Sequence, residues 1–225
     1  MNRRRLVFLR MSALMLIATA FTTLVAHLVD FPTSSFEEQV LLFPNWKYLL
    51  RNDIIILHCA FVIVSMLGLG LLEHKRQSGW ISMGFLCFFI FGIAEIVRMA
   101  MANTVVTDLR AQYYHSTSEL LRADIHFWLQ YIWPKVGSLL FLIFIVAFSL
   151  GCICYGIAFV HRKWVGLVFI IWGVVNLIAF GNEFIKNEGL SSAIEFFSST
   201  YQPLARLFIG LWFWSAIPEA LKQTE

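Results

Sequence analysis

Charged residues are scarce in this sequence, and their scarcity excludes most water-soluble folds. Only 14% of the 225 residues are Asp, Glu, Lys or Arg, whereas 59% are hydrophobic. Soluble domains carry roughly 25% charged and about 45–50% apolar residues. A chain of this composition cannot bury its apolar surface inside a water-facing core, so a lipid bilayer is the expected environment. The net charge of +3 is small, and no basic patch suggests a nucleic-acid partner.

The sequence also lacks the patterns that identify common catalytic and metal sites. It contains no G-x-S-x-G, no P-loop and no G-x-G-x-x-G. Its four cysteines all fall inside apolar runs and form no C-x-x-C pair, which argues against a redox motif or a zinc knuckle. Neither H-x-x-x-H nor E-x-x-H occurs, although helical metal sites usually take two ligands from one helix in this way. Whether the protein is an enzyme therefore stays open.

What the sequence does contain is a series of long apolar runs within one domain, residues 1–225. A helix needs about 20 apolar residues to cross a bilayer. The first run follows three arginines, as in a signal peptide, but it is too long for a signal-peptide core and shows no A-x-A-like cleavage site. We therefore expect an all-α polytopic integral membrane bundle of six transmembrane helices. Their expected spans are about 6–29, 54–72, 80–102, 136–160, 164–181 and 203–221.

The distribution of Lys and Arg predicts the orientation of these spans. One side would carry Arg3, Arg4, Arg5, Arg10, Lys75, Arg76, Arg162, Lys163 and Lys222. The other side has longer segments but only Lys47, Arg51, Arg110, Arg122, Lys135 and Lys186. Because positive residues concentrate in cytoplasmic loops, we expect both termini in the cytoplasm. The long outer segments suggest a bacterial inner membrane.

The three outer segments, near 30–53, 103–135 and 182–202, each exceed twenty residues and are amphipathic. Each contains a Ser-x-x-Glu pattern typical of a capping box, starting at Ser35, Ser116 and Ser192. Pro134 should kink or break the chain before the fourth span. We therefore expect short interfacial helices that lie at the outer headgroup level.

The third expected span carries two opposite charges, Glu95 and Arg98, inside an apolar run. A charged side chain at the middle of a bilayer costs about 2.5–3.5 kcal/mol on insertion scales. The i, i+3 spacing places this carboxylate and guanidinium on one helical face, where each partly neutralises the other. The pair is either a structural ion pair or part of a site.

Other polar residues fall at a similar depth, in the outer halves of the remaining spans. They include His27, Asp53, His58, Asn176, Glu183 and Arg206. Asp53 has an alternative role as the N-cap of the second span. Lipid-facing positions would be costly for these groups, so we expect them to point into the bundle or into an outward-facing pocket.

The leading hypothesis is a pocket that binds a small polar or amphipathic ligand, either a small molecule or a lipid-like one, in a sensor, a carrier or a complex subunit. Its expected ligand-binding residues are Glu95, Arg98, Asn176, Glu183, Arg206 and Asp53. The two arginines would hold an anionic group. One alternative is a membrane-embedded enzyme that binds haem or a metal ion through His27 and His58. Another is a structural subunit of a membrane complex or a homo-oligomer.

Overall fold

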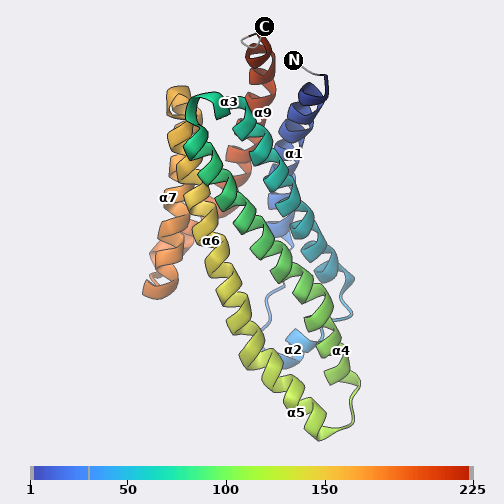
Figure 1. Cartoon of the computed structure of the whole chain (residues 1–225). Helices are drawn as coiled ribbons and strands as arrows, with labels where there is room; N and C mark the ends of the chain where they lie inside the picture. Colours follow the sequence, from blue (N-terminus) through green and yellow to red (C-terminus); the bar gives the residue numbers. More distant parts are fainter. Residues whose placement is uncertain (1–2, 30, 223–225) are drawn as a thin grey trace.

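The computed structural model describes the backbone of residues 3–29 and 31–222, and the side chains of these residues except 74–76 and 219–222. This part of the chain is helical and contains no strand (Figure 1). The elements, in chain order, are α1 (Arg3–Leu28), α2 (Phe36–Val40), α3 (Trp46–Met101), η1 (Ala102–Val106), α4 (Thr107–His115), α5 (Glu119–Phe127), η2 (Trp128–Ile132), α6 (Trp133–Ala158), η3 (Val160–Arg162), α7 (Lys163–Ile185), α8 (Glu188–Phe196), η4 (Phe197–Tyr201) and α9 (Gln202–Lys222).

Five helical stretches among the described residues are long and apolar enough to cross a membrane, which supports a multi-pass membrane bundle. They are Arg3–Leu28, Trp46–Glu73, Gln77–His115, Glu119–Ala158 and Val160–Ile185. The second stretch and the first part of the third belong to α3, which reverses direction at the non-helical backbone of Gln77 (Figure 1). The sixth expected span corresponds to α9, which packs along α1, but it is not among the five, so the number six is not confirmed.

Both chain ends lie at one end of the bundle, together with the reversal in α3 and the turn between α6 and α7 (Figure 1). Of the charged residues expected there, Lys75, Arg76 and Lys222 have side chains outside the described residues. The buried carboxylate of Glu73 joins the two turns, because its Oε1 lies 3.2 Å from His161 Nε2 and 3.6 Å from Arg162 Nε. This end is therefore tied together by charge as well as by packing.

The opposite end differs from the expected collar of interfacial helices. Segment 103–135 is not a loop with a short helix; α4 continues α3 through the π-helical turn η1, and α5 leads through η2 into α6. The two stretches reach 39 and 40 residues, or about 60 Å at 1.5 Å per residue, twice the roughly 30 Å hydrocarbon core. They form a helical hairpin that extends well beyond the rest of the bundle (Figure 1). Pro134 does not break this helix, because it lies in the first turn of α6, directly after η2.

The short helix α2 begins as its capping box predicts. The Ser35 hydroxyl accepts a hydrogen bond from the Glu38 amide at 3.2 Å. The Glu38 carboxylate accepts hydrogen bonds from the backbone N–H and the hydroxyl of Ser34, and these bonds lower the pKa of Glu38. α2 packs against α4 and so covers part of one side of the projecting hairpin.

The other two expected capping boxes are wrong in position. Ser118, not Ser116, caps α5, and Ser116 instead accepts a hydrogen bond from the Ser118 amide. α8 begins at Glu188 after its N-cap Asn187, four residues before Ser192. Each helix begins directly after a Ser or Asn whose side-chain oxygen accepts a hydrogen bond from a backbone amide of the first turn.

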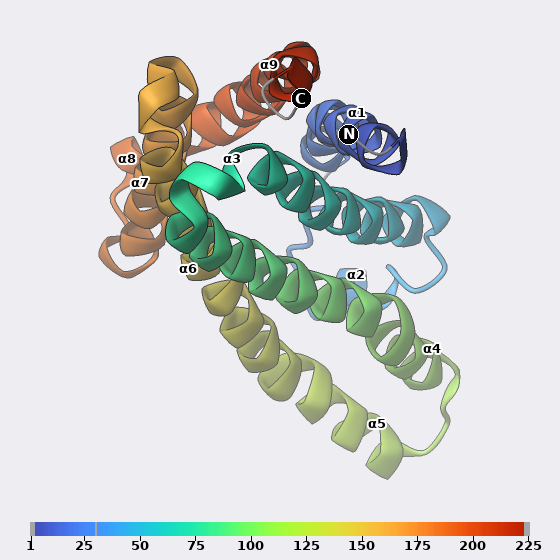
Figure 2. The same ribbon diagram turned by 45° about the horizontal axis from the view of Figure 1, so that its top comes forward.

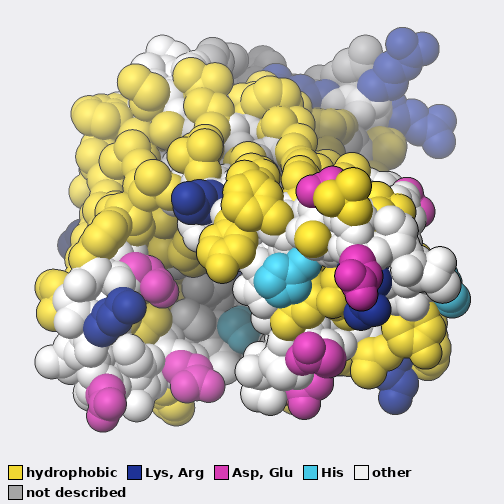
Figure 3. Space-filling view, turned by 90° about the horizontal axis from the view of Figure 1, so that it is seen from below, with side chains coloured by type: hydrophobic (Ala, Val, Ile, Leu, Met, Phe, Trp, Pro, Cys, Tyr) yellow, Lys and Arg dark blue, Asp and Glu magenta, His cyan; other side chains and the backbone are white. Residues whose placement is uncertain are grey.

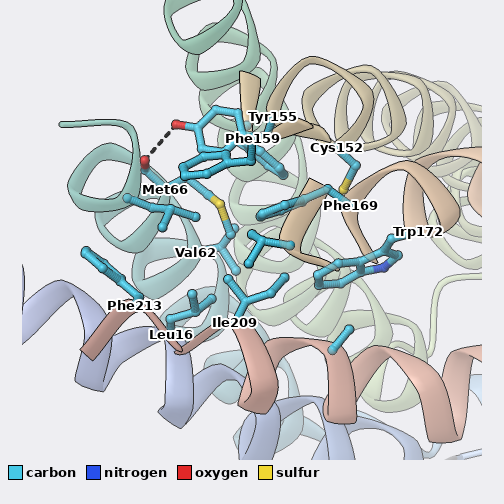
Figure 4. Close-up of a cluster of buried hydrophobic side chains, with 14 of the residues drawn as sticks. Leu16, Val62, Met66, Cys152, Tyr155, Phe159, Phe169, Trp172, Ile209 and Phe213 are labelled. Atoms are coloured by element: carbon cyan, nitrogen blue, oxygen red, sulfur yellow. Dashed lines mark hydrogen bonds between the residues drawn. The ribbon is translucent and has the colours of Figure 1, made fainter. Parts of the chain in front are cut away.

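The core of the bundle fills the half nearer the chain ends, where α1, α3, α6, α7 and α9 meet. Figure 4 shows its centre, built largely from aromatic and branched side chains. Its buried residues include Leu16, Val62, Met66, Cys152, Tyr155, Phe159, Phe169, Trp172, Ile209 and Phe213. The Tyr155 hydroxyl donates to the Met66 carbonyl at 2.7 Å and so connects α6 to α3 inside the core.

Helices α6 and α7 pack closely at this end and separate toward the other (Figures 1 and 2). A Cβ added at Gly166 would lie 2.8 Å from the Gly156 carbonyl oxygen, and one at Gly173 would lie 2.7 Å from that of Ser149. Only glycine permits such an approach of two helix backbones. Further along, Gly137 of α6 and Gly181 of α7 have no neighbour within 4 Å of an added Cβ.

Candidate functional site

A cavity of about 480 Å³ lies between the helices at the end of the bundle away from the termini. Its lining residues come from α1, α3, α6, α7, α8, η4 and α9. Figure 3 views the molecule from this end and shows a hollow with acidic side chains near its edge. Among the residues expected to gather at one depth, the following line the cavity: His27, His58, Glu95, Arg98, Asn176, Glu183 and Arg206.

Glu95 and Arg98 form a bidentate ion pair on α3. Arg98 Nε donates to Glu95 Oε2 at 2.8 Å, and Arg98 Nη2 donates to Glu95 Oε1 at 2.6 Å. The Glu95 side chain is only 6% exposed, whereas that of Arg98 is 28% exposed. The pair therefore neutralises a carboxylate in the cavity wall and leaves Arg98 with little free charge for a ligand.

Arg206 lies one turn into α9, and its surroundings differ from those of Arg98. The residue is 3% exposed, and its guanidinium stacks over Trp172 at 4.7 Å and over Phe148 at 5.8 Å. Its Nε and Nη1 atoms are buried and have no hydrogen-bond partner among the described residues. Because an unsatisfied buried donor costs about 1–3 kcal/mol, a hydrogen-bond acceptor in the cavity would stabilise this guanidinium.

His58 of α3 reaches toward α1, where its Nδ1 lies 2.7 Å from the Thr22 hydroxyl. Two helix carbonyls of α1 also lie near that hydroxyl, at 3.2 and 3.3 Å. The single hydroxyl proton can serve these carbonyls while the oxygen accepts from His58 Nδ1–H. This pattern favours a proton on His58 Nδ1, and in the neutral imidazole Nε2 would then be the acceptor atom. His27 lines the cavity as an exposed residue near the end of α1.

The polar residues of α7 have two separate roles at the cavity. Asn176 donates from Nδ2 to the Trp172 carbonyl at 2.7 Å, which leaves its oxygen available. Asn182 accepts from the Asn187 amide at 3.1 Å and donates to the Ser191 hydroxyl at 2.8 Å, so it fixes the turn between α7 and α8. Glu183, next to this turn, is exposed at the rim.

Asp53 does not line the cavity and does not cap a helix. Its carboxylate accepts from Asn103 Nδ2 at 2.7 Å, and Asn103 Oδ1 accepts from Asn52 Nδ2 at 2.7 Å. The N-cap of α3 is Asn45, eight residues before Asp53, and α3 starts at Trp46. Asp53 thus belongs to a polar network that joins the first half of α3 to η1.

Several lining residues were not anticipated. Arg51 lines the cavity and donates from Nε to the Ala26 carbonyl at 3.4 Å. One wall is aromatic and consists of Phe141, Phe144 and Phe148 of α6. Their spacing, i, i+3 and i+7, places them on one helical face, and this was the sequence signal that would have found them.

The histidines do not assemble a recognisable metal centre with neighbouring ligands. Among the side chains that the structure describes, in residues 3–29, 31–73 and 77–218, no group of three or more His, Cys, Asp or Glu is placed to hold a metal ion. A haem ligated by His27 and His58 alone is a different arrangement and stays a hypothesis. Comparisons of the chain with protein-family models, with curated proteins and with solved structures found no match.

Proposed function

We propose that this integral membrane protein binds a small polar or amphipathic ligand through an anionic group, in the cavity that Arg206 lines. The observation that carries the proposal is the buried guanidinium of Arg206, whose Nε and Nη1 atoms have no hydrogen-bond partner in the part of the chain that the structure describes. A carboxylate or phosphate group would accept hydrogen bonds from this guanidinium and neutralise its charge in a low-dielectric setting. We infer a sensor, a carrier or a complex subunit rather than an enzyme.

The neighbouring residues would assist in different ways. Arg51 adds a second positive charge to the wall, and Asn176 offers a free amide oxygen to a hydroxyl or amine of the ligand. The Glu95–Arg98 pair would set the local field without binding the anion directly, because each partner already satisfies the other. His58 would accept a proton or a hydrogen bond at Nε2.

The orientation is part of the proposal. The uneven distribution of Lys and Arg along the sequence is the reason to expect both termini in the cytoplasm, and the cavity lies at the opposite end of the bundle. The cavity would then face the periplasm if the protein resides in a bacterial inner membrane. An outward-facing site suits a ligand that arrives from outside the cell or from the outer leaflet.

Binding of defined anions to the purified protein in detergent tests this proposal. The probes are glycerol 3-phosphate and phosphatidic acid for phosphate, and acetate and oleate for carboxylate, measured by the shift in the thermal unfolding midpoint. Charge-assisted hydrogen bonds contribute about 1.5–3 kcal/mol, so Arg206→Gln should weaken the best probe roughly 10- to 150-fold. If no probe shifts the midpoint, or if Arg206→Gln binds as well as the wild type, the proposal is wrong.

Arg10 provides the matched control for Arg206. It also lies in an expected span and stacks over a tryptophan ring, that of Trp214, at 5.8 Å, but it does not line the cavity. Arg10→Gln should therefore leave probe binding within about twofold of the wild type, an energy of roughly 0.4 kcal/mol. Equal losses in the two variants would point to a general effect of removing a membrane arginine.

The haem alternative has one supporting observation, because His27 and His58 line the same cavity. A visible absorption spectrum of the purified protein tests it directly. A Soret band that disappears in His58→Ala would replace anion binding with haem binding as the leading function. Elemental analysis of the same sample gives the corresponding test for a metal ion.

A further inference from the structure

Beside the cavity, α6 and α7 separate and leave a gap between them (Figures 1 and 2). The helix faces that border this gap are continuous with the faces through which α6 and α7 pack against each other nearer the chain ends. On α7, Gly166 and Gly173 face α6, and helical periodicity places Phe184, eleven residues after Gly173, on the same face. On α6, Gly156 and Ser149 face α7, and Leu142, seven residues before Ser149, lies on the same face. Phe184 is 74% exposed and Leu142 is 37% exposed.

Both flanks of this gap are apolar, which suits hydrocarbon rather than water. Leu142 borders the gap on α6, and Phe184 borders it on α7. The lipid-facing sides next to them carry further exposed apolar residues, Leu139 on α6 and Ile178 on α7. In a membrane bundle, an opening with apolar edges faces the acyl chains of the bilayer.

Inside the opening, the cavity wall on α6 can accommodate an acyl chain. Phe141, Phe144 and Phe148 follow each other over seven residues, or about 10 Å of helix. Phe91 of α3 packs against this wall, with its ring centroid 5.0 Å from those of Phe144 and Phe148. The inner end of the wall meets Arg206, whose guanidinium stacks over Phe148.

The rim that faces water has the opposite character. Glu183 and Glu195 line the cavity as exposed residues at this end, near the turn between α7 and α8. Lys186 lies in that turn but does not line the cavity. A free anion that approached from water would pass these carboxylates, whereas an amphiphile that arrived through the gap would not.

We propose that the ligand of this cavity is a membrane amphiphile with an anionic headgroup, which reaches Arg206 sideways through the gap between α6 and α7. The headgroup would accept hydrogen bonds from Arg206, and an acyl chain would lie along Phe141, Phe144 and Phe148 toward the gap. This inference rests on the proposed function, because it names the class of ligand for the same anion site.

Native mass spectrometry of the full chain in detergent separates this inference from the proposed function. The probes are phosphatidic acid, phosphatidylcholine with the same acyl chains, and glycerol 3-phosphate. We expect phosphatidic acid to bind at least tenfold more tightly than either of the other two, and Arg206→Gln to reduce its preference over phosphatidylcholine to within threefold. The conservative change Phe144→Leu should weaken phosphatidic acid several-fold and leave any glycerol 3-phosphate binding unchanged.

The outcomes differ for the two proposals. Arg206-dependent binding of glycerol 3-phosphate that equals or exceeds that of phosphatidic acid would overturn the lipid inference and leave the anion site intact. Failure of all anionic probes to bind through Arg206 would overturn both. A phosphatidic acid with a photoreactive acyl chain tests the route, and we expect its crosslinks in residues 138–148 and 177–185. Crosslinks confined to α1 and the first half of α3 would refute access between α6 and α7.

Discussion

Replacing Arg206 with methionine should stabilise the ligand-free protein while it abolishes anion binding. Methionine has a similar length but no charge and no donor, so it removes the two nitrogen donors, Nε and Nη1, that have no partner among the described residues. Two unsatisfied buried donors cost roughly 2–6 kcal/mol. The variant also loses the contacts of the guanidinium with Trp172 and Phe148, which are worth about 0.5–2 kcal/mol each.

At the middle of these ranges, about 4 kcal/mol is gained from the donors and about 2.5 kcal/mol is lost from the two ring contacts, which leaves a net stabilisation of roughly 1–2 kcal/mol. For a chain of this size, that corresponds to an increase of about 2–8 °C in the unfolding midpoint. The assay is thermal unfolding in detergent, in a buffer without phosphate or carboxylate, so that no added ligand supplies the missing acceptor. The same preparation, titrated with the probes above, should show no shift in the Arg206→Met protein.

A comparison with Arg98→Met makes the reasoning refutable. That change removes a guanidinium whose partner is present, and it leaves the Glu95 side chain, 6% exposed, without its counter-charge. Breaking a fully buried pair costs about 3–5 kcal/mol, and the partial exposure of Arg98 places the expected loss at or below the lower end of that range. If Arg206→Met also lowers the midpoint, then water or another acceptor already satisfies Arg206, and its role as an empty anion site is refuted.

Three further outcomes follow from other parts of the structure. Glu95→Gln should leave the protein folded but strengthen binding of the anionic probes several-fold, because it removes a negative charge from the cavity; unchanged binding across pH would mean that the pair does not influence the site. Gly173→Leu should lower the unfolding midpoint, since its Cβ would lie 2.7 Å from a carbonyl oxygen of α6 and the strain of overpacking costs about 1–3 kcal/mol, whereas Gly181→Leu should be nearly neutral. In a background without native cysteines, a membrane-impermeant maleimide added to intact cells should label Thr117→Cys but not Ser78→Cys, and the reverse result would invert the proposed orientation.

The sequence predicted the spans well because hydrophobic length is a local property. The expected spans 54–72, 80–102 and 164–181 fall inside long apolar helical stretches, and the expected spans 6–29 and 136–160 extend past the ends of theirs by one and two residues. The shared depth of the polar residues was also predictable, because depth follows from counting 1.5 Å per residue from a span end. Six of the ionisable residues that line the cavity could be found in this way, although their contacts could not: His27, His58, Glu95, Arg98, Glu183 and Arg206.

The conformation of segment 103–135 was predicted wrongly for a reason that lies in its composition. Polar residues suggested an outer loop, but no Gly or Pro occurs between Gly92 and Pro134, so nothing in the backbone ends the helix except the short turn at 116–118. Polarity marks the end of the membrane, whereas only a breaker or a cap marks the end of a helix. A reading that separated these two boundaries would have predicted the projecting hairpin.

The two membrane arginines show which pairings a sequence can reveal. Arg98 has Glu95 three residues away, so its partner was visible in the sequence and the pair formed as expected. Arg206 has no Asp or Glu within four residues on either side, so any protein partner had to come from another helix. The bundle instead surrounds it with Trp172 and Phe148 and leaves two of its nitrogen atoms without an acceptor among the described residues. A guanidinium that neither its own helix nor its neighbours neutralise is costly to keep in a membrane, and a ligand that brings the missing charge is the simplest reason to keep it.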